Sequence, residues 1–247
     1  LENEITDKTI LVSVMHINNE IGTINDIKKI YEVIKSKNKK TYFHTDCVQS
    51  FCKYPINSKY ADLITLSSHK IHGPKGAGAL FIKKGTRIEP VFIGGKQQNG
   101  IRSGTENVPG IAGFAVAAEN MNKNISKNYE KVLSVKNKLK EIKNLLPDIY
   151  INGDEINSSA YILNMSFQNI KGEVLLHSLE SENIYVSTGS ACTSNHKKHT
   201  GTVDIIGGMG ENSVRFSFSD ENTIEESEKC IAALLKIVPF LRQYRQL

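Results

Sequence analysis

The chain has 247 residues, 39% of them hydrophobic, and 31 Lys and Arg against 26 Asp and Glu give a formal net charge of +5. This composition is enough for one large domain or two modest ones, and it excludes a disordered, collagen-like or wholly coiled-coil chain. The surplus lysines are spread along the sequence and form no basic block, so no nucleic-acid partner is expected. No segment approaches the roughly 18–20 apolar residues of a membrane-spanning helix, so no membrane association is expected.

The cysteines stand at positions 47, 52, 192 and 230, and no pair shows the CxxC spacing. There is no charged and then apolar leader, so scattered thiols favour a reducing cytoplasm. Cys192, His196 and His199 would supply only three metal ligands, and no second pair completes them, so no metal is expected. The chain starts at Leu1, and we therefore expect a processed chain or a fragment.

Short apolar runs and one helical pattern alternate in the first part of the chain. Strands are predicted at residues 10–15, 41–45, 61–66 and 79–82. A helix is predicted at 26–37, with Asp26 at its start and lysines at its end, as the helix dipole favours. Strand, helix and strand in this order predict an α/β domain with a mainly parallel sheet, which we place at residues 1–118.

The second part of the chain has longer helical patterns. Residues 113–146 are predicted as one helix that leads into a small α+β domain at 119–247. Further strands are predicted at 161–167 and 184–187, and further helices at 172–179 and 223–241. Thr223 and Glu226 form a capping-box pattern at the start of the last helix.

Polar residues follow the predicted strands, where open α/β sheets place their ligands. Lys70 comes directly after one strand and can form a Schiff base when its amine is deprotonated. Asp46 ends the neighbouring strand and can keep a pyridinium nitrogen protonated, so the pair suits pyridoxal phosphate. Ser67, His69 and Thr105 offer donors to a phosphate group. A single lysine or aspartate after a strand is common in proteins without a cofactor. Only the order of all these residues together supports a cofactor site.

Six segments extend this pattern over nearly the whole chain: VSVMHINNEIG, FHTDCVQS, SSHKIHGPKGAGAL, GIRSGTENVPGIAG, STGSACTS and SVRFSFS. With them the chain resembles the cysteine desulfurases of the nitrogen-fixation and iron–sulfur-cluster type, in the class V aminotransferase group. The resemblance implies the pyridoxal-phosphate-dependent transferase fold type I, a homodimer, and conversion of L-cysteine to L-alanine with a persulfide on Cys192. The sulfur would pass to an acceptor protein, either an iron–sulfur scaffold or an enzyme that thiolates a cofactor or tRNA.

The resemblance also implies the role of each matching residue. Lys70 matches the lysine that carries the cofactor, and Cys192 matches the nucleophilic thiol, in a run of small residues that suits a mobile loop. Arg215 matches the arginine that grips the substrate carboxylate, which a guanidinium can bind with two parallel hydrogen bonds. The matching cofactor contacts are Asn19 (which also lies beside the substrate), Asp46, Gln49, Ser67, His69, Lys70 and, from the other subunit, Thr105.

Two departures from the family change the expectation. The glycines at 207, 208 and 210 lower helix propensity after the Cys192 loop, and Asp220 stands where Gly-Arg is usual. The family also has on the order of a hundred further residues before this start, with a Gly-Thr phosphate turn and a histidine stacked on the cofactor ring. We therefore expect an incomplete large domain with an exposed sheet edge and apolar face. Because the large domain is expected to be incomplete, we also expect this chain alone to bind the cofactor weakly and to show little turnover.

Two alternatives stay open on the sequence. The chain could be a selenocysteine lyase or another carbon–sulfur lyase, which alanine release from cysteine against selenocysteine distinguishes. It could also be a catalytically inactive remnant that serves as an interaction module, in which case it would bind no cofactor.

Overall fold

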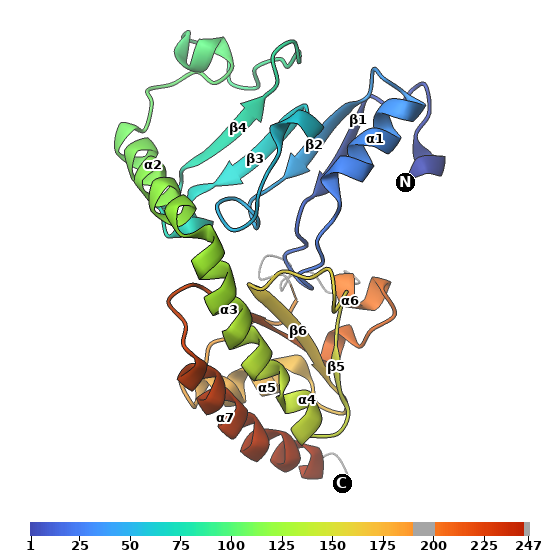
Figure 1. The fold of residues 1–247 in the computed structure, drawn as a ribbon, viewed down its shortest axis with the longest axis vertical. Helices are drawn as coiled ribbons and strands as arrows, with labels where there is room; N and C mark the ends of the chain where they lie inside the picture. Colours follow the sequence, from blue (N-terminus) through green and yellow to red (C-terminus); the bar gives the residue numbers. More distant parts are fainter. Residues whose placement is uncertain (190–200, 245–247) are drawn as a thin grey trace. The chain divides into compact units, whose positions relative to one another are not determined.

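The computed structural model describes residues 1–189 and 201–244 and is shown in Figure 1. The chain forms two compact units, the first from Leu1–His16 with Asn25–Ile125 and the second from Ile17–Ile24 with Ser126–Leu247. The boundary expected between residues 118 and 119 lies inside a helix, and Ile17–Ile24, which we expected in the first domain, is part of the second unit.

A four-stranded sheet in the order β1-β2-β3-β4 forms the centre of the first unit (Figure 1). Its strands are β1 (Leu11–Met15), β2 (Tyr42–Asp46), β3 (Leu63–Ser67) and β4 (Gly78–Ile82). The first three strands run parallel, and β4 pairs antiparallel with β3. The mainly parallel sheet predicted from the sequence is therefore confirmed, each strand lying within two residues of its predicted bounds.

Two helices accompany this sheet, α1 (Ile27–Lys37) and α2 (Val108–Lys123). Asp26 caps α1, its carboxylate accepting the Lys29 N–H across 3.0 Å, as the sequence pattern predicts. Ile34 of α1 and Phe43 of β2 are fully buried in a shared apolar cluster. Short 3-10 helices complete the unit: η1 (Glu2–Glu4), η2 (Ser58–Tyr60), η3 (Ser68–Ile71) and η4 (Gln97–Gly100).

The second unit has a three-stranded antiparallel sheet in the order β5-β6-β7. The strands are β5 (Ile149–Ile151), β6 (Ile162–Phe167) and β7 (Ser213–Ser217). The helices are α3 (Ile125–Lys140), α4 (Ile142–Leu145), α5 (Gly172–Glu180), α6 (Thr202–Ile205) and α7 (Ile224–Gln243), with a 3-10 turn η5 (Gly210–Asn212). Thr223 and Glu226 form the predicted capping box on α7.

Strand β6, predicted at 161–167, is buried on both of its faces. Leu163 and Met165 pack into the main core of the unit with residues of α5 and α7. On the other face Asn164 donates to the Glu20 carbonyl oxygen across 3.1 Å, and Ser166 donates to the Met209 carbonyl oxygen across 3.1 Å. The segment Ile17–Ile24 thus covers the face that the helices leave open.

Two predicted elements are wrong. The single helix expected at 113–146 is three helices, because Asn124 leaves the helical conformation and bonds its side chain back to the Asn120 carbonyl oxygen, and the chain breaks again at Glu141. The strand expected at 184–187 is a single bridge between Ser187 and Arg215.

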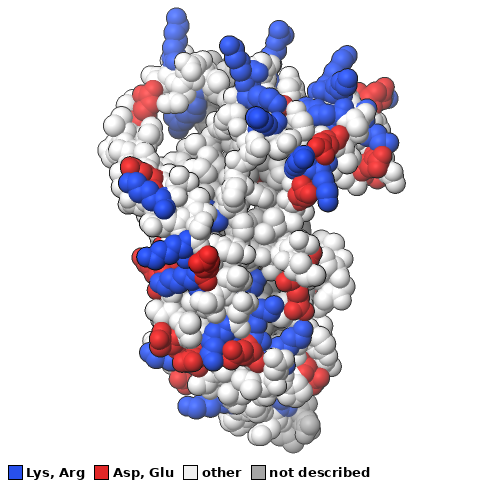
Figure 2. All heavy atoms as spheres, viewed as in Figure 1, with Lys and Arg blue, Asp and Glu red and all other residues white. Residues whose placement is uncertain are grey.

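The first unit has the exposed sheet edge and apolar surface that the sequence predicts. Strands β1 and β4 are the two edges of the sheet, and Leu11 and Leu80 are each about half exposed, at 49% and 47%. Figure 2 shows Lys and Arg spread over the face in view, many of them beside Asp or Glu. None of the helices in the described parts of the chain is long and apolar enough to cross a membrane.

Candidate active site

Asp46 lies at the carboxyl edge of the parallel strands in the first unit. It ends β2 in register with Met15 of β1 and Thr65 of β3. Its carboxylate Oδ1 accepts the Val48 N–H across 2.8 Å, which fixes the side chain at the turn that follows the strand. Gln49 lies half-buried in the same turn. The sheet therefore presents a fixed carboxylate where ligands of open α/β sheets bind.

Lys70 lies on η3, the single 3-10 turn that follows β3. Ser68 and Ile71 of this turn are fully buried, which leaves Lys70 half-buried and His69 exposed. The turn ends at His72, which has a left-handed backbone (φ 64°), and at Gly73, where a Cβ atom would lie 2.1 Å from Ser68 Oγ. Packing of the buried residues therefore fixes the backbone from which Lys70 projects.

The two phosphate-ligand candidates of this turn lie together. Ser67 Oγ and His69 Nδ1 are 2.8 Å apart, so hydroxyl and imidazole form one polar pair beside Lys70. Thr105 is placed elsewhere in the first unit, exposed in the loop between η4 and α2. Asp46, Gln49, Ser67, His69 and Lys70 thus share one sheet edge, and the roles of these residues and of Thr105 stay predictions.

A chain of side-chain hydrogen bonds across the three parallel strands was missed in the sequence analysis. His44 Nδ1 lies 2.7 Å from Ser13 Oγ of β1, and His44 Nε2 lies 2.7 Å from Thr65 Oγ1 of β3. Burial lowers the pKa of His44, and the nearby Asp46 charge opposes this shift in part. Because His44 and Asp46 are two residues apart on a strand, they share a face, and this spacing is the signal that could have revealed the histidine.

Arg215 and Asn19 meet in the second unit. The Arg215 guanidinium, on β7, donates from Nη1 to the Asn19 carbonyl oxygen across 3.0 Å. Its Nε is buried and has no hydrogen-bond partner among the described residues. Burial lowers the pKa of Arg215, and the carboxylate of Glu20 opposes this shift. A buried guanidinium N–H without a partner is costly, and a carboxylate ligand would satisfy it.

Cys192 lies outside the described residues, so its predicted role is not tested by the structure. The other three cysteines are buried free thiols: Cys47, Cys52 and Cys230. Burial raises the pKa of all three, and that of Cys230 rises to about 12. These thiols are therefore unsuited to nucleophilic chemistry.

Comparisons with known proteins bear on this arrangement. The family model described as aminotransferase class-V matches residues 1–229. The chain belongs to this family. It is 40% identical to the cysteine desulfurase IscS of Methanosarcina thermophila and 37% identical to that of Dictyoglomus turgidum, with 98% of this chain covered in each comparison. The chain spans 61% and 62% of the length of these two relatives.

Solved structures described as NifS-like proteins agree with the fold. One described as a NifS-like protein superposes with a TM-score of 0.89 at 35% identity and covers 97% of this chain and 64% of its own. The NifS-like protein from Rickettsia africae gives a TM-score of 0.84 at 32% identity, covering 96% of this chain and 64% of its own. The pyridoxal-phosphate-dependent fold predicted from the sequence is therefore confirmed.

The residues of the first unit fit pyridoxal phosphate, the cofactor of this family. Lys70 supplies an amine, Asp46 a carboxylate, and Ser67 with His69 a pair of phosphate donors, all on one sheet edge. This donor set matches the aldehyde, the ring nitrogen and the phosphate of the cofactor. In the second unit, the Arg215 Nε, which has no partner in the part of the chain that the structure describes, fits the carboxylate of an amino-acid substrate.

Proposed function

We propose that this chain carries the catalytic residues of a pyridoxal-phosphate-dependent cysteine desulfurase, which converts L-cysteine to L-alanine and forms a persulfide on Cys192. The observation that supports it most is the placement of Asp46 at the end of β2 and of Lys70 just after the neighbouring parallel strand β3, with the Ser67–His69 pair beside Lys70 in the chain. The likeness to two desulfurases over 98% of the chain supports the same reaction.

The residues of the first unit would hold the cofactor. Asp46 would accept a hydrogen bond from the protonated ring nitrogen and so keep the positive charge on the ring. Ser67 and His69 would donate to the phosphate, and Gln49 would contact the phenolic oxygen. Lys70 would carry the cofactor and then act as the amine that moves a proton at the substrate α-carbon. When bound, the cofactor withdraws electrons from this carbon.

The residues of the second unit would bind the substrate. Arg215 would bind the carboxylate of L-cysteine through the N–H groups not used on the Asn19 carbonyl, and Asn19 would lie beside it. One solved relative is described as SspA in complex with cysteine, at a TM-score of 0.71 and 29% identity over 89% of this chain and 61% of its own. This finding supports L-cysteine as the substrate.

The sulfur step takes place at Cys192. The Cys192 thiolate attacks the sulfur of L-cysteine, an S–S bond forms, and the C–S bond of the substrate breaks. A proton replaces sulfur on the β-carbon and gives L-alanine, so that thiol plus cysteine yields persulfide plus alanine without an outside oxidant. The persulfide sulfur would pass to an acceptor protein, either an iron–sulfur scaffold or a thiolation enzyme.

We propose that the enzyme works as a homodimer in the cytoplasm. Thr105 would contribute its hydroxyl to the phosphate site of the second copy. It is exposed in the stretch between β4 and α2, which also carries Val91 and Ile93, 87% and 90% exposed. Such exposed apolar side chains favour an interface. The buried free thiols Cys47, Cys52 and Cys230 suit a reducing compartment.

The test is alanine formation from L-cysteine in the presence of pyridoxal phosphate, with persulfide on Cys192 detected by mass spectrometry. It is run with the 247-residue chain and, where a longer reading frame encodes it, with that longer protein. Equal amounts of alanine and persulfide are expected, with selenocysteine as the comparison substrate. Cofactor binding without alanine release from cysteine would overturn the desulfurase assignment.

A further inference from the structure

The Cys192 segment, residues 190–200, has described residues on both sides of it. On the N-terminal side, the Arg215 N–H donates to the Ser187 carbonyl oxygen across 2.7 Å, and the Ser187 N–H donates back to the Arg215 carbonyl oxygen across 3.1 Å. The Arg215 guanidinium in turn donates to the Asn19 carbonyl oxygen. The N-terminal flank is therefore joined through one arginine to the segment Ile17–Ile24.

On the C-terminal side, Gly201 leads into α6. The Thr202 N–H donates to the Glu20 carboxylate Oε2 across 3.1 Å. Thr202 is the first residue of α6, and the N–H groups of a first helical turn have no acceptor within the helix. The Glu20 carboxylate satisfies this N–H.

The backbone of Glu20 is itself held in place. Its N–H donates to Asn18 Oδ1 across 2.9 Å, and its carbonyl oxygen accepts from Asn164 of β6 across 3.1 Å. Gly22 has a left-handed backbone (φ 75°), and a Cβ atom there would lie 3.1 Å from Ile162 Cβ, so the segment packs closely on β6. Both flanks of residues 190–200 therefore reach adjacent residues, Asn19 and Glu20, on one fixed segment.

We propose that Glu20 is a positioning residue. Its carboxylate ties Thr202, on the C-terminal flank of the Cys192 segment, to the residue pair Asn19-Glu20, which we call the anchor and to which Arg215 also bonds. The anchor would hold the two flanks of the Cys192 segment and the substrate-binding Arg215 in fixed positions relative to one another. This inference rests on the proposed roles of Cys192 and Arg215. The tie itself, between Glu20 and Thr202, is independent of those roles and can be measured without cofactor.

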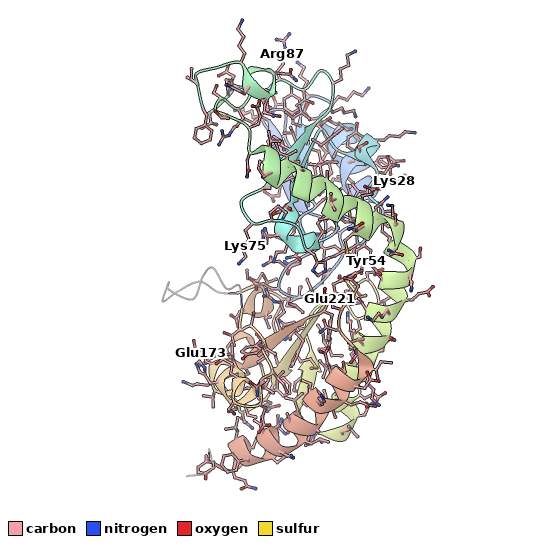
Figure 3. All side chains as sticks on the ribbon, turned by 90° about the vertical axis from the view of Figure 1, so that its left-hand side faces the viewer. Lys28, Tyr54, Lys75, Arg87, Glu173 and Glu221 are labelled. Atoms are coloured by element: carbon pink, nitrogen blue, oxygen red, sulfur yellow. The ribbon has the colours of Figure 1, made fainter. Side chains whose placement is uncertain are left out.

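Four single variants test the tie from both of its ends. Glu20→Ala removes the acceptor, whereas Glu20→Gln keeps an oxygen that can accept the Thr202 N–H. Thr202→Pro removes the donor at a first helical position, where proline is favoured, after a Gly201 whose extended backbone (ψ 167°) suits a residue before proline. The control is Glu173→Ala, at an exposed glutamate on α5 that is labelled in Figure 3.

The first readout is limited trypsin cleavage after Lys197 and Lys198, which lie in the segment. Cleavage is expected to be about three- to tenfold faster in Glu20→Ala and in Thr202→Pro, because each loses one charge-assisted hydrogen bond. The double variant should be no faster than either single one, and Glu20→Gln and Glu173→Ala should stay within about twofold of the parent. Amide hydrogen exchange at Thr202 should accelerate in Glu20→Ala alone among the glutamate variants. Unchanged cleavage in both tie variants, or independent effects that multiply in the double variant, would overturn the tie.

The second readout separates positioning from mere stabilisation. With pyridoxal phosphate and L-cysteine, Glu20→Ala and Thr202→Pro should lower the rate of persulfide formation about tenfold, Glu20→Gln should restore most of it, and the cysteine KM should change less than the rate. Faster cleavage with an unchanged persulfide rate would overturn the positioning role. If the parent forms no persulfide at all, the proposed function fails, while cleavage and exchange still decide whether the tie exists.

Discussion

The ammonium of Lys136, on α3, donates to the Ser159 carbonyl oxygen across 2.7 Å and to Ser158 Oγ across 2.8 Å. Ser158 forms a bridge with Thr23, and the Ser159 N–H donates to the Gly22 carbonyl oxygen across 2.8 Å. The lysine, only 5% exposed, therefore holds the loop that in turn holds the segment carrying Asn19 and Glu20.

The same burial predicts a pH-dependent stability. The pKa of Lys136 is lowered, chiefly by desolvation, to about 8 from an ordinary 10.5. The nearby Lys140 charge contributes to this lowering, and the Glu155 charge opposes it. Between these two pKa values the unfolded chain binds more protons than the folded chain, so the lysine's contribution to the free energy of unfolding rises with pH. From pH 8 to 10 the free energy of unfolding of the parent should rise by about 2 kcal/mol relative to that of Lys136→Met.

Urea unfolding at pH 7, 8, 9 and 10 measures this difference. The control is Lys127→Met, at an exposed lysine on the same helix. Its difference from the parent should stay within about 0.5 kcal/mol over the whole range. A Lys136→Met difference that is flat with pH would show that the buried ammonium is not destabilised in the folded chain.

A second prediction concerns the lysine that holds the cofactor. Borohydride reduction in the presence of pyridoxal phosphate should label Lys70 and not Lys75. Lys70 is half-buried on η3, whose neighbours Ser68 and Ile71 are fully buried, whereas Lys75 is exposed on the loop that follows (Figure 3). Peptide mass spectrometry identifies the labelled residue.

Matched variants make the labelling experiment decisive. Lys70→Ala should lower specific labelling by at least about tenfold, and Lys75→Ala should leave it unchanged, since the exposed side chain has no part in the site. Labelling that moves with Lys75 would contradict the assignment of the amine.

The third prediction is that protonation of His44 destabilises the folded chain. Burial lowers its pKa, so the unfolded chain takes up a proton at a higher pH than the folded chain does, and stability falls as the pH drops through about 6.5. His44→Gln removes the titration and should flatten that fall. Urea unfolding from pH 7 to 5 measures it, with the exposed His177→Gln as the control. An identical fall in parent and His44→Gln would contradict the prediction.

The sequence alone predicts the strands and the residues at their ends, because a short apolar run followed by polar residues has few other interpretations in an α/β domain. Asp46 and Lys70 are found this way, and the register of β2 with β3 places them on one edge. His44 is not found this way, because the role of a histidine inside a strand depends on its cross-strand neighbours, here Ser13 and Thr65, which the sequence does not identify.

Long-range relationships could not be read from the sequence. The bond between Glu20 and Thr202 joins residues 182 positions apart, and no local pattern marks either of them. The assignment of Ile17–Ile24 to the second unit has the same cause, since it depends on packing against β6. Helix ends were also missed where a side chain competed for the backbone, as at Asn124.

The fourth prediction assigns the sulfur chemistry to one of the four thiols. Cys192→Ser should abolish persulfide formation and leave cofactor binding unchanged, because the thiol attacks the substrate sulfur and has no part in holding the cofactor. Cys230→Ala should keep persulfide formation, since burial raises the pKa of that thiol to about 12 and leaves almost no thiolate at pH 8. In the native chain at pH 8, iodoacetamide should modify Cys192 well before the buried Cys47, Cys52 and Cys230, and all four should react in urea. Alanine production at the parent's rate by Cys192→Ser, or persulfide found on Cys47, would show that another group receives the sulfur.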